Sequence, residues 1–239
     1  MGSFVDSLRE AVLLLLGGNR YVIEIVLLSL RVSGLALLLG VALGLPVGVV
    51  VGLARFRGRG IAISLIHTGF ALPPVVVGLF VYMMLSRSGP AGGLELLFTP
   101  TAMTLAQALL AAPYVAGISL AAVQAVPADV RLQAQALGAS PLRALLTHLR
   151  EARLGIGAAI VAGFGAVISE VGAVMMVGGN IAGETRVMTT AIVLETRRGN
   201  FATALAFGLI LLLLAFIVNA ALTRGQQGRT GLTAGRRSW

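Results

Sequence analysis

The chain has 239 residues, of which 57% are hydrophobic and 11% charged, with a formal net charge of +9. That apolar share exceeds what a soluble domain of this size buries, and it indicates a bundle of membrane-spanning helices. The apolar segments are continuous rather than alternating, which disfavours a β-barrel, and the arginines are scattered at segment ends, which disfavours nucleic-acid binding.

The first twenty residues carry a helical pattern. Apolar side chains recur at helical spacing from Phe4 to Leu15, and the apolar run 11–16 is too short for a signal peptide. We expect residues 1–20 to form an amphipathic helix that lies at the membrane interface.

Five apolar segments follow, and each has the roughly 20 residues that cross a bilayer. They predict an all-α, polytopic membrane domain over residues 21–223. The predicted spans are 22–54, 61–85, 99–123, 154–177 and 201–222.

Arginines set the expected orientation, because the cytoplasmic side of a membrane protein carries more of them. Eleven arginines lie in the stretches 55–59, 131–153 and 224–237, on one side of the predicted bundle, and six lie on the other. The N-terminus should therefore be outside. The loop 127–153 and a flexible tail at 224–239 should be cytosolic.

Glycines recur at every fourth position of the first predicted span. They share one face of the helix, and small residues at this spacing let two helices approach closely. The stripe predicts packing within the subunit, which we favour, or alternatively a sliding or dimer contact. Its members are Gly40, Gly44, Gly48 and Gly52.

Pro73 and Pro74 interrupt the second predicted span, since together they remove two backbone donors. A broken helix at bilayer depth is tolerated only where protein or a water-filled cavity covers the exposed backbone. The proline pair is therefore a candidate pathway element, and a purely structural kink is the alternative.

The loop 127–153 is predicted to be a helical hairpin. Gly138 should end its first helix in a left-handed conformation, and Ser140 should cap the second, with Pro141 at its first position. A cytosolic hairpin with an apolar stripe suggests docking of a soluble partner, and packing beneath its own bundle is the alternative.

This hairpin resembles the coupling motif of ABC-importer permeases, which is usually Glu-Ala-Ala, three residues, Gly, nine residues, Ile-x-Leu-Pro. Ala134 and Gly138 match that motif, and the flanking sequence LGASPLRA at 137–144 is typical of it. The resemblance implies a loop that transmits ATPase motion to the spans, and its residues would be Ala134, Leu137, Gly138 and Ser140.

Segments 168–180 and 185–196, together with 71–78 and 55–59, closely resemble tungstate-transport permeases; molybdate permeases look less similar across 168–180. The resemblance implies a type I ABC-importer permease fold. It also implies a homodimer in the membrane, with two ATPase subunits below and an extracytoplasmic binding protein above.

The same resemblance implies a non-catalytic subunit that binds no cofactor itself, with ATP and Mg²⁺ held by the partner ATPase. The residues agree, because a chain without lysine cannot form a phosphate-binding loop of the Gly-x4-Gly-Lys type. Two histidines in different segments make a metal centre improbable, and no span offers a catalytic pair.

Glu170 lies within an otherwise uncharged stretch, and a carboxylate at bilayer depth costs roughly 2.5–3.5 kcal/mol on insertion scales. Because it would repel an anionic cargo, we expect a gating or structural role, with the carboxyl neutral or paired with Arg31. The candidate pathway or gate residues are Pro73, Pro74, Ser169, Glu170 and Asn180.

Hydroxyls and arginines near the outer end of the fourth predicted span offer donors to an oxyanion. The hydroxyl candidates are Ser169, Thr185, Thr189 and Thr190. Arg186, Arg197 and Arg198 would attract the anion or dock the binding protein, unless they are ordinary interfacial arginines.

The predicted function is the permease subunit of an ATP-driven importer that conducts an oxyanion, with tungstate as the favoured cargo. Molybdate or sulfate is the alternative cargo. An ATP-independent secondary transporter is disfavoured, because the sequence shows no inverted repeat.

Overall fold

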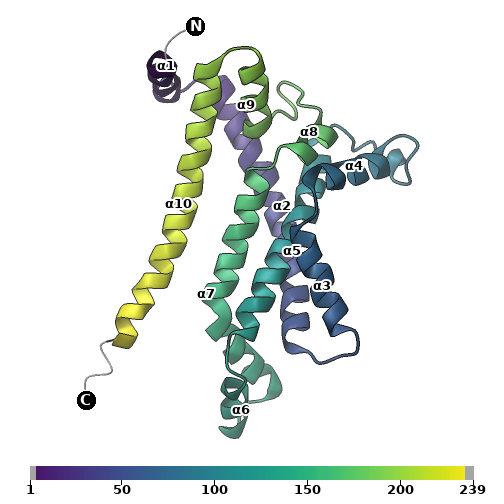
Figure 1. The fold of residues 1–239 in the computed structure, drawn as a ribbon, viewed down its shortest axis with the longest axis vertical. Coiled ribbons are helices and arrows are strands. Elements are labelled where there is room, and N and C mark those ends of the chain that lie inside the picture. Colours follow the sequence, from purple (N-terminus) through teal and green to yellow (C-terminus); the bar gives the residue numbers. More distant parts are fainter. Residues whose placement is uncertain (1–3, 235–239) are drawn as a thin grey trace.

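A computed structural model describes residues 4–234, which form one all-helical subunit (Figure 1). The elements in chain order are α1 (Phe4–Leu16), α2 (Arg20–Leu53), α3 (Arg59–Phe70), α4 (Pro74–Leu85), the 3₁₀ turn η1 (Gly92–Leu94), α5 (Pro100–Gln124), α6 (Asp129–Ala136), α7 (Pro141–Ile168), α8 (Gly172–Gly178), α9 (Met188–Arg197) and α10 (Phe201–Ala234).

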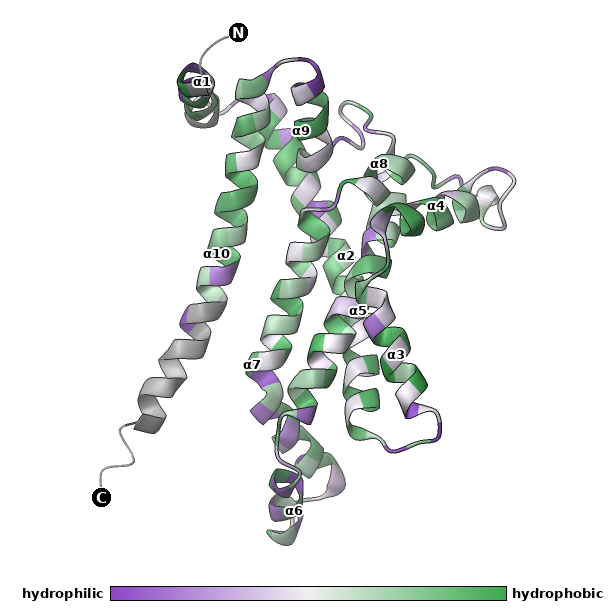
Figure 2. Ribbon diagram, viewed as in Figure 1, coloured by the Kyte–Doolittle hydropathy of each residue, from purple (hydrophilic) through white to green (hydrophobic). Residues whose placement is uncertain are grey.

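Within residues 4–234, four helices are long and apolar enough to cross a membrane: α2, α5, α7 and the Phe201–Ala221 part of α10. The shortest of the first three, α5, has 25 residues, which is about 38 Å at 1.5 Å per residue and exceeds the roughly 30 Å hydrocarbon core. Figure 2 shows hydrophobic residues along the middle of these helices. The fold is that of a polytopic membrane protein.

The second predicted span is two helices, α3 and α4, which meet at an angle of 98°. Each has 12 residues, about 18 Å, and is too short to cross alone. Pro73 occupies the N-cap position of α4 and Pro74 its first helical position, where a missing backbone donor costs nothing. Because α2 ends at one end of the bundle and α5 begins near the other, the bent pair carries the chain between them (Figure 1).

The fourth predicted span, 154–177, is wrong at its far boundary. The second helix of the hairpin and the span are one continuous helix, α7, because nothing between Pro141 and Ile168 removes a donor or caps an end. At the far boundary α7 stops at Ile168 and a separate helix, α8, begins at Gly172. The break occurs at Ser169–Val171, where the Glu170 carboxylate caps α8.

The two ends of the described chain lie at opposite ends of the molecule (Figure 1). Helix α1 packs against α10 with Ala11 fully buried, while its expected place at the membrane interface stays a prediction. Helix α10 continues to Ala234, so most of the segment 224–239 is helical, and residues 235–239 lie outside the described residues.

The glycine stripe of α2 lies against α5. A Cβ added to Gly40 would overlap the side chain of Ala111, and one on Gly44 would overlap the carbonyl oxygen of Ala112. The stripe continues with Gly48 facing Ala116 and Gly52 facing Val123. The absence of side chains on this face thus permits backbone contact between α2 and α5 inside the subunit.

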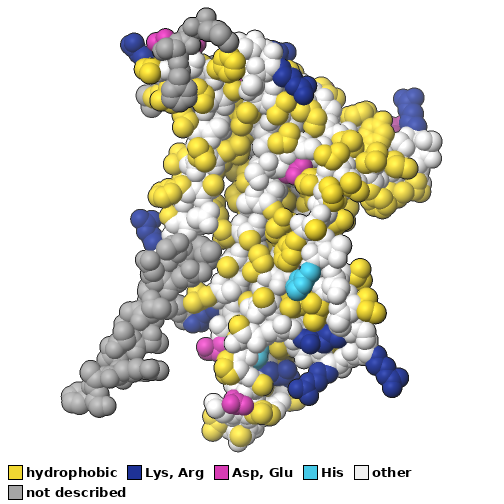
Figure 3. Space-filling view, viewed as in Figure 1, with side chains coloured by type: hydrophobic (Ala, Val, Ile, Leu, Met, Phe, Trp, Pro, Cys, Tyr) yellow, Lys and Arg dark blue, Asp and Glu magenta, His cyan; other side chains and the backbone are white. Residues whose placement is uncertain are grey.

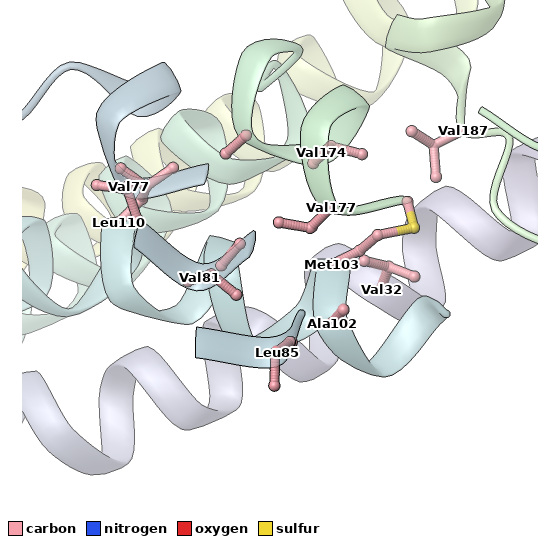
Figure 4. Close-up of a cluster of buried hydrophobic side chains, with 12 residues drawn as sticks. Val32, Val77, Val81, Leu85, Ala102, Met103, Leu110, Val174, Val177 and Val187 are labelled. Carbon is pink, nitrogen blue, oxygen red and sulfur yellow. The ribbon is translucent and has the colours of Figure 1, made fainter. Parts of the chain in front are cut away.

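The largest hydrophobic cluster joins helices α2, α4, α5 and α8 (Figure 4). Met103 of α5 and Val177 of α8 are fully buried at its centre, and Val81 of α4 packs beside them. Figure 3 shows hydrophobic side chains over the middle of the visible face, with arginines concentrated toward the two ends. The broken helices are therefore anchored by apolar packing near one end of the bundle.

Candidate functional site

The α6–α7 hairpin ends in a tight, exposed tip. Gly138 has a φ of +86°, and the amides of Gly138 and Ala139 donate to the carbonyls of Gln135 and Ala134. This pair of bonds is a Schellman C-cap, which needs a residue that tolerates the left-handed conformation. Gly138 therefore turns the chain, as the sequence predicted.

The start of α7 is capped from the same tip. The Ser140 hydroxyl accepts a hydrogen bond from the amide of Arg143 at 3.4 Å, and Pro141 occupies the first helical position. Farther along, His148 is buried and its Nε2 lies 2.8 Å from the carbonyl oxygen of Val123 at the end of α5. The hairpin is thus joined to the bundle by α7, while its tip stays free.

The hairpin tip presents apolar side chains to its surroundings. Leu137 is 89% exposed and Leu142 is 66% exposed, and α6 contributes no buried residue. Exposed apolar groups grouped on a protruding element mark an interaction surface. This arrangement argues against the alternative that the hairpin packs wholly beneath its own bundle.

Glu170 lies in the break between α7 and α8. Its carboxylate oxygen Oε1 accepts a hydrogen bond of 2.9 Å from the amide of Ala173, and its side chain is largely buried. Arg31 forms no ion pair with it among residues 4–234, where the salt bridges are Arg20–Glu24 and Arg198–Glu195. The alternative of a pair with Arg31 is therefore not found within residues 4–234, where the carboxylate accepts a backbone amide.

The two helix breaks meet in space. A Cβ built on Gly172 would lie 2.7 Å from Cγ2 of Val75 and 3.5 Å from Oε1 of Glu170. One turn farther on, Gly78 of α4 packs against Ala173 of α8. The fold therefore places the proline break of residues 71–73 beside the Ser169–Val171 break, although they are about one hundred positions apart in the chain.

The predicted hydroxyl donors are mostly used within the protein. Thr185 donates to the carbonyl of Gly178 at 2.5 Å and accepts from the amide of Ile181 at 2.9 Å. Thr190 caps the start of α9 through Val187, and Thr189 donates to the carbonyl of Glu170 at 2.7 Å. Ser169 is exposed and donates to its own helix. Thr185 and Thr190 thus fasten the segment between α8 and α9, and Thr189 joins α9 to the break between α7 and α8.

A network of polar side chains joins the segment between α8 and α9 to the start of α2. The Arg186 guanidinium donates to both the side chain and the carbonyl of Asn180, at 3.2 Å each, and to the Tyr21 hydroxyl at 3.3 Å. Tyr21 also donates to the buried carboxylate of Glu195 at 3.2 Å. The fold thus brings Asn180 and Arg186 together and ties both to the start of α2.

Glu195 extends this network to the start of α10. It accepts from the guanidinium of Arg198 at 3.3 Å and from the side chain of Asn200 at 2.8 Å. Arg197 is exposed and forms no hydrogen bond or ion pair within the described part of the chain. Tyr21 and Glu195 were absent from the sequence-based candidates, because no local pattern links residues more than 160 positions apart.

Residues 44–228 match the family described as "Binding-protein-dependent transport system inner membrane component". The chain belongs to this family. It is a membrane-embedded permease subunit of an ABC importer, and the predicted class is confirmed.

Curated relatives of this permease cover nearly its whole length. A "Probable anion ABC transporter permease protein" of Haloferax volcanii is 48% identical over 219 residues, 88% of this chain and 94% of the relative. The "Tungstate uptake system permease protein TupB" of Peptoclostridium acidaminophilum is 37% identical over 93% of this chain and 97% of its own. The protein of the same name from Campylobacter jejuni is 34% identical over 90% of each chain.

Solved structures share the permease's fold at low sequence identity. A bacterial alginate ABC transporter, solved in complex with an alginate-bound periplasmic protein, has a chain that matches with a TM-score of 0.71 and 18% identity. The match covers 91% of this permease and 85% of that chain. An amino acid ABC transporter solved with histidines matches with a TM-score of 0.68. The architecture is thus that of ABC-importer membrane subunits.

Proposed function

We propose that this permease forms the membrane pathway of an ATP-driven tungstate importer. The choice of tungstate as the cargo rests on sequence identity to relatives. Two permeases named for tungstate uptake are 37% and 34% identical to this chain, whereas two named for molybdenum transport are 29% and 28% identical. The nearly full-length coverage of both groups makes this difference a property of the whole membrane domain.

The end of the molecule that carries the α6–α7 hairpin faces the cytosol in this proposal. Seven arginines of the stretches 55–59 and 131–153 lie at that end, which agrees with the arginine bias of cytoplasmic loops. The exposed Leu137 and Leu142 are suited to a groove on an ATPase subunit, because apolar groups on a protruding helix bury favourably there. The N-terminus and α9 then lie outside, where a binding protein would deliver the cargo.

A second copy of the chain would complete the pathway. Residues 71–76 at the proline break are all exposed in the single subunit, as is Ser169 at the other break. At membrane depth, the N–H and C=O groups that a helix break leaves unpaired must be covered by protein or must line a water-filled cavity. We place these two breaks along the surface that the copies share, with the cargo passing between them.

Within this pathway Glu170 acts as a structural cap. Its carboxylate accepts the amide of Ala173, and this bond supports a fixed start of α8. Direct binding of an oxyanion is disfavoured, since two negative charges at close range repel strongly away from water.

Uptake by the reconstituted transporter tests the proposal. The permease, its ATPase and its binding protein would be placed in proteoliposomes, and ATP-dependent accumulation of tungstate would be measured in competition with molybdate and sulfate. We expect tungstate to accumulate and to be displaced poorly by the other two. Accumulation without ATP would instead indicate a secondary transporter.

Molybdate or sulfate is the second candidate cargo. Relatives named for molybdenum transport in Haemophilus influenzae and Escherichia coli are 29% and 28% identical, and a sulfate permease of Synechococcus elongatus is 26% identical. All these oxyanions are tetrahedral dianions, so the same fold can serve each. Equal displacement by molybdate in the uptake assay would favour this candidate.

A further inference from the structure

A cavity of about 680 Å³ lies between the α6–α7 hairpin and the ends of α2 and α5. Figure 3 shows arginines gathered at this end of the molecule. Three arginines and one histidine line the cavity, and no acidic residue does. These four residues are Arg55, Arg59, Arg131 and His148.

Arg59 is held in place on one wall of the cavity. Its Nε and Nη2 donate to the carbonyls of Val51, at 2.9 Å, and Gly52, at 3.2 Å, in the last turn of α2. These carbonyls carry the negative end of the helix dipole, and the bonds neutralise them. The remaining donors of the guanidinium are left for a ligand, because arginine has five N–H groups in all.

The other two arginines bring uncompensated charge. Arg55 is exposed on the α2–α3 connection and Arg131 is half-buried on α6, and neither side chain has a hydrogen bond or an ion pair to any residue in 4–234. The nearest carboxylate in sequence, Asp129, does not line the cavity. Like charges that share a cavity repel, and an anion between them would remove that repulsion.

His148, which also lines the cavity, has one buried polar atom without a hydrogen-bond partner among the described residues. It is 2% exposed, and its Nε2 lies 2.8 Å from the carbonyl oxygen of Val123, so the ring nitrogen donates there. Its Nδ1 is buried and has no hydrogen-bond partner within the described residues. The ring therefore joins α7 to the end of α5 and leaves contact with a ligand to the arginines.

We propose that this cavity binds a phosphate-like oxyanion, held by Arg55, Arg59 and Arg131. Guanidinium groups bind such oxygens in bidentate geometry, which suits arginine rather than lysine. Since Arg59 belongs to the bundle and Arg131 to the hairpin, the ligand would tie the hairpin to the α2–α3 connection. The site is separate from the transported cargo and does not depend on its identity.

Two sources carry this chemistry: a free oxyanion of the cytosol and the phosphodiester of an anionic lipid such as phosphatidylglycerol. The test uses the assembled permease–ATPase complex in a phosphate-free maltoside detergent. Hydrogen exchange of the α6 amides is followed while inorganic phosphate is added. A ligand that binds only the folded α6 lowers the population of its locally unfolded, exchanging state by a factor of 1 + [L]/Kd, so exchange should slow about tenfold at ten times the Kd.

Variants identify the site. Arg131→Gln and Arg55→Gln should weaken phosphate binding roughly tenfold each, because each loses a charge-assisted contact. Arg55 makes no bond in the structure, so its variant keeps the fold. Arg143→Gln is the matched control, since Arg143 lies exposed on the same hairpin outside the cavity lining and should bind like the parent.

A second experiment distinguishes free phosphate from a lipid headgroup as the ligand. The complex is placed in nanodiscs with or without phosphatidylglycerol, and the same α6 exchange is measured. Protection by that lipid, lost in Arg131→Gln, with no effect of free phosphate, would assign the site to a lipid headgroup. Protection by neither ligand would overturn the proposal, and so would equal loss of binding in Arg143→Gln. Neither result bears on cargo uptake, which is measured independently.

Discussion

The Thr189 hydroxyl at the start of α9 donates a hydrogen bond of 2.7 Å to the main-chain carbonyl of Glu170, at the break between α7 and α8. The carboxylate of the same glutamate accepts the amide of Ala173 in α8. Glu170 is therefore held through both its backbone and its side chain. An acidic residue that looks isolated in the sequence fastens three helices together.

Two substitutions of Glu170 distinguish a helix-capping role from a role as a charged gate. We expect Glu170→Gln to transport nearly as well as the parent, because the amide oxygen still accepts from Ala173. Glu170→Ala removes the acceptor and should lower stability by about 0.5–2 kcal/mol, as loss of a helix cap does. Thermal stability of the purified permease and ATP-dependent uptake measure the two effects. A Glu170→Gln protein that is stable but inactive would show instead that the charge itself is needed.

Substitution of Gly138 tests the hairpin tip. A side chain in the left-handed conformation costs about 1–2 kcal/mol, and a β-branched one more, so Gly138→Val should distort the tip. We expect ATP hydrolysis by the assembled complex to continue while uptake falls, since the hairpin no longer transmits the motion.

The control for that experiment is Gly60→Val, at a glycine near the start of α3 that has open space around it. It should leave the ratio of uptake to hydrolysis unchanged. Full uptake in Gly138→Val would mean that the tip does not couple the ATPase to the spans.

The contact between α2 and α5 predicts opposite outcomes for two glycines of one helix. Gly44→Ala places a Cβ against the carbonyl of Ala112, and we expect a loss of about 1–3 kcal/mol, as overpacking causes. Gly34→Ala meets open space, and it should be neutral or stabilise by roughly 0.5–1 kcal/mol through backbone entropy. Midpoints of thermal unfolding in detergent compare the pair. Equal midpoints would show that α2 does not depend on this contact.

Substitutions of Arg186 and Arg197 should have different effects, although both residues were candidates for the same role. Arg186→Gln loses bonds to Asn180 and Tyr21, so proteolysis of the 179–187 loop should accelerate several-fold. Arg197→Gln loses no internal bond, so stability should be unchanged. If Arg197 docks the binding protein, its variant should weaken that association in a salt-dependent way. Equal protease resistance of the two variants would show that the hydrogen bonds of Arg186 do not hold the 179–187 loop in place.

The membrane class, most helix positions and the hairpin cap were predictable because each depends on local chemistry. The length of the apolar segments predicted the spans, and the proline pair predicted the break between α3 and α4. Gly138 and Ser140 predicted the turn of the hairpin. The break after Ile168 was not predicted. Glu170 can accept the amide of Ala173 only because α7 has already ended, and no local pattern in the sequence shows that it ends there.

The sequence by itself determined the family, the apolar spans and the chemistry that a hairpin tip would present. The tertiary structure alone decided which polar groups remain available, because hydrogen bonds between distant segments consume donors that look free in the sequence. Arg186 is committed to Asn180 and Tyr21, while Arg55 and Arg131 have no partner among the described residues. It also decided that the two helix breaks lie side by side, because packing of α4 on α8 brings together residues that no local pattern connects.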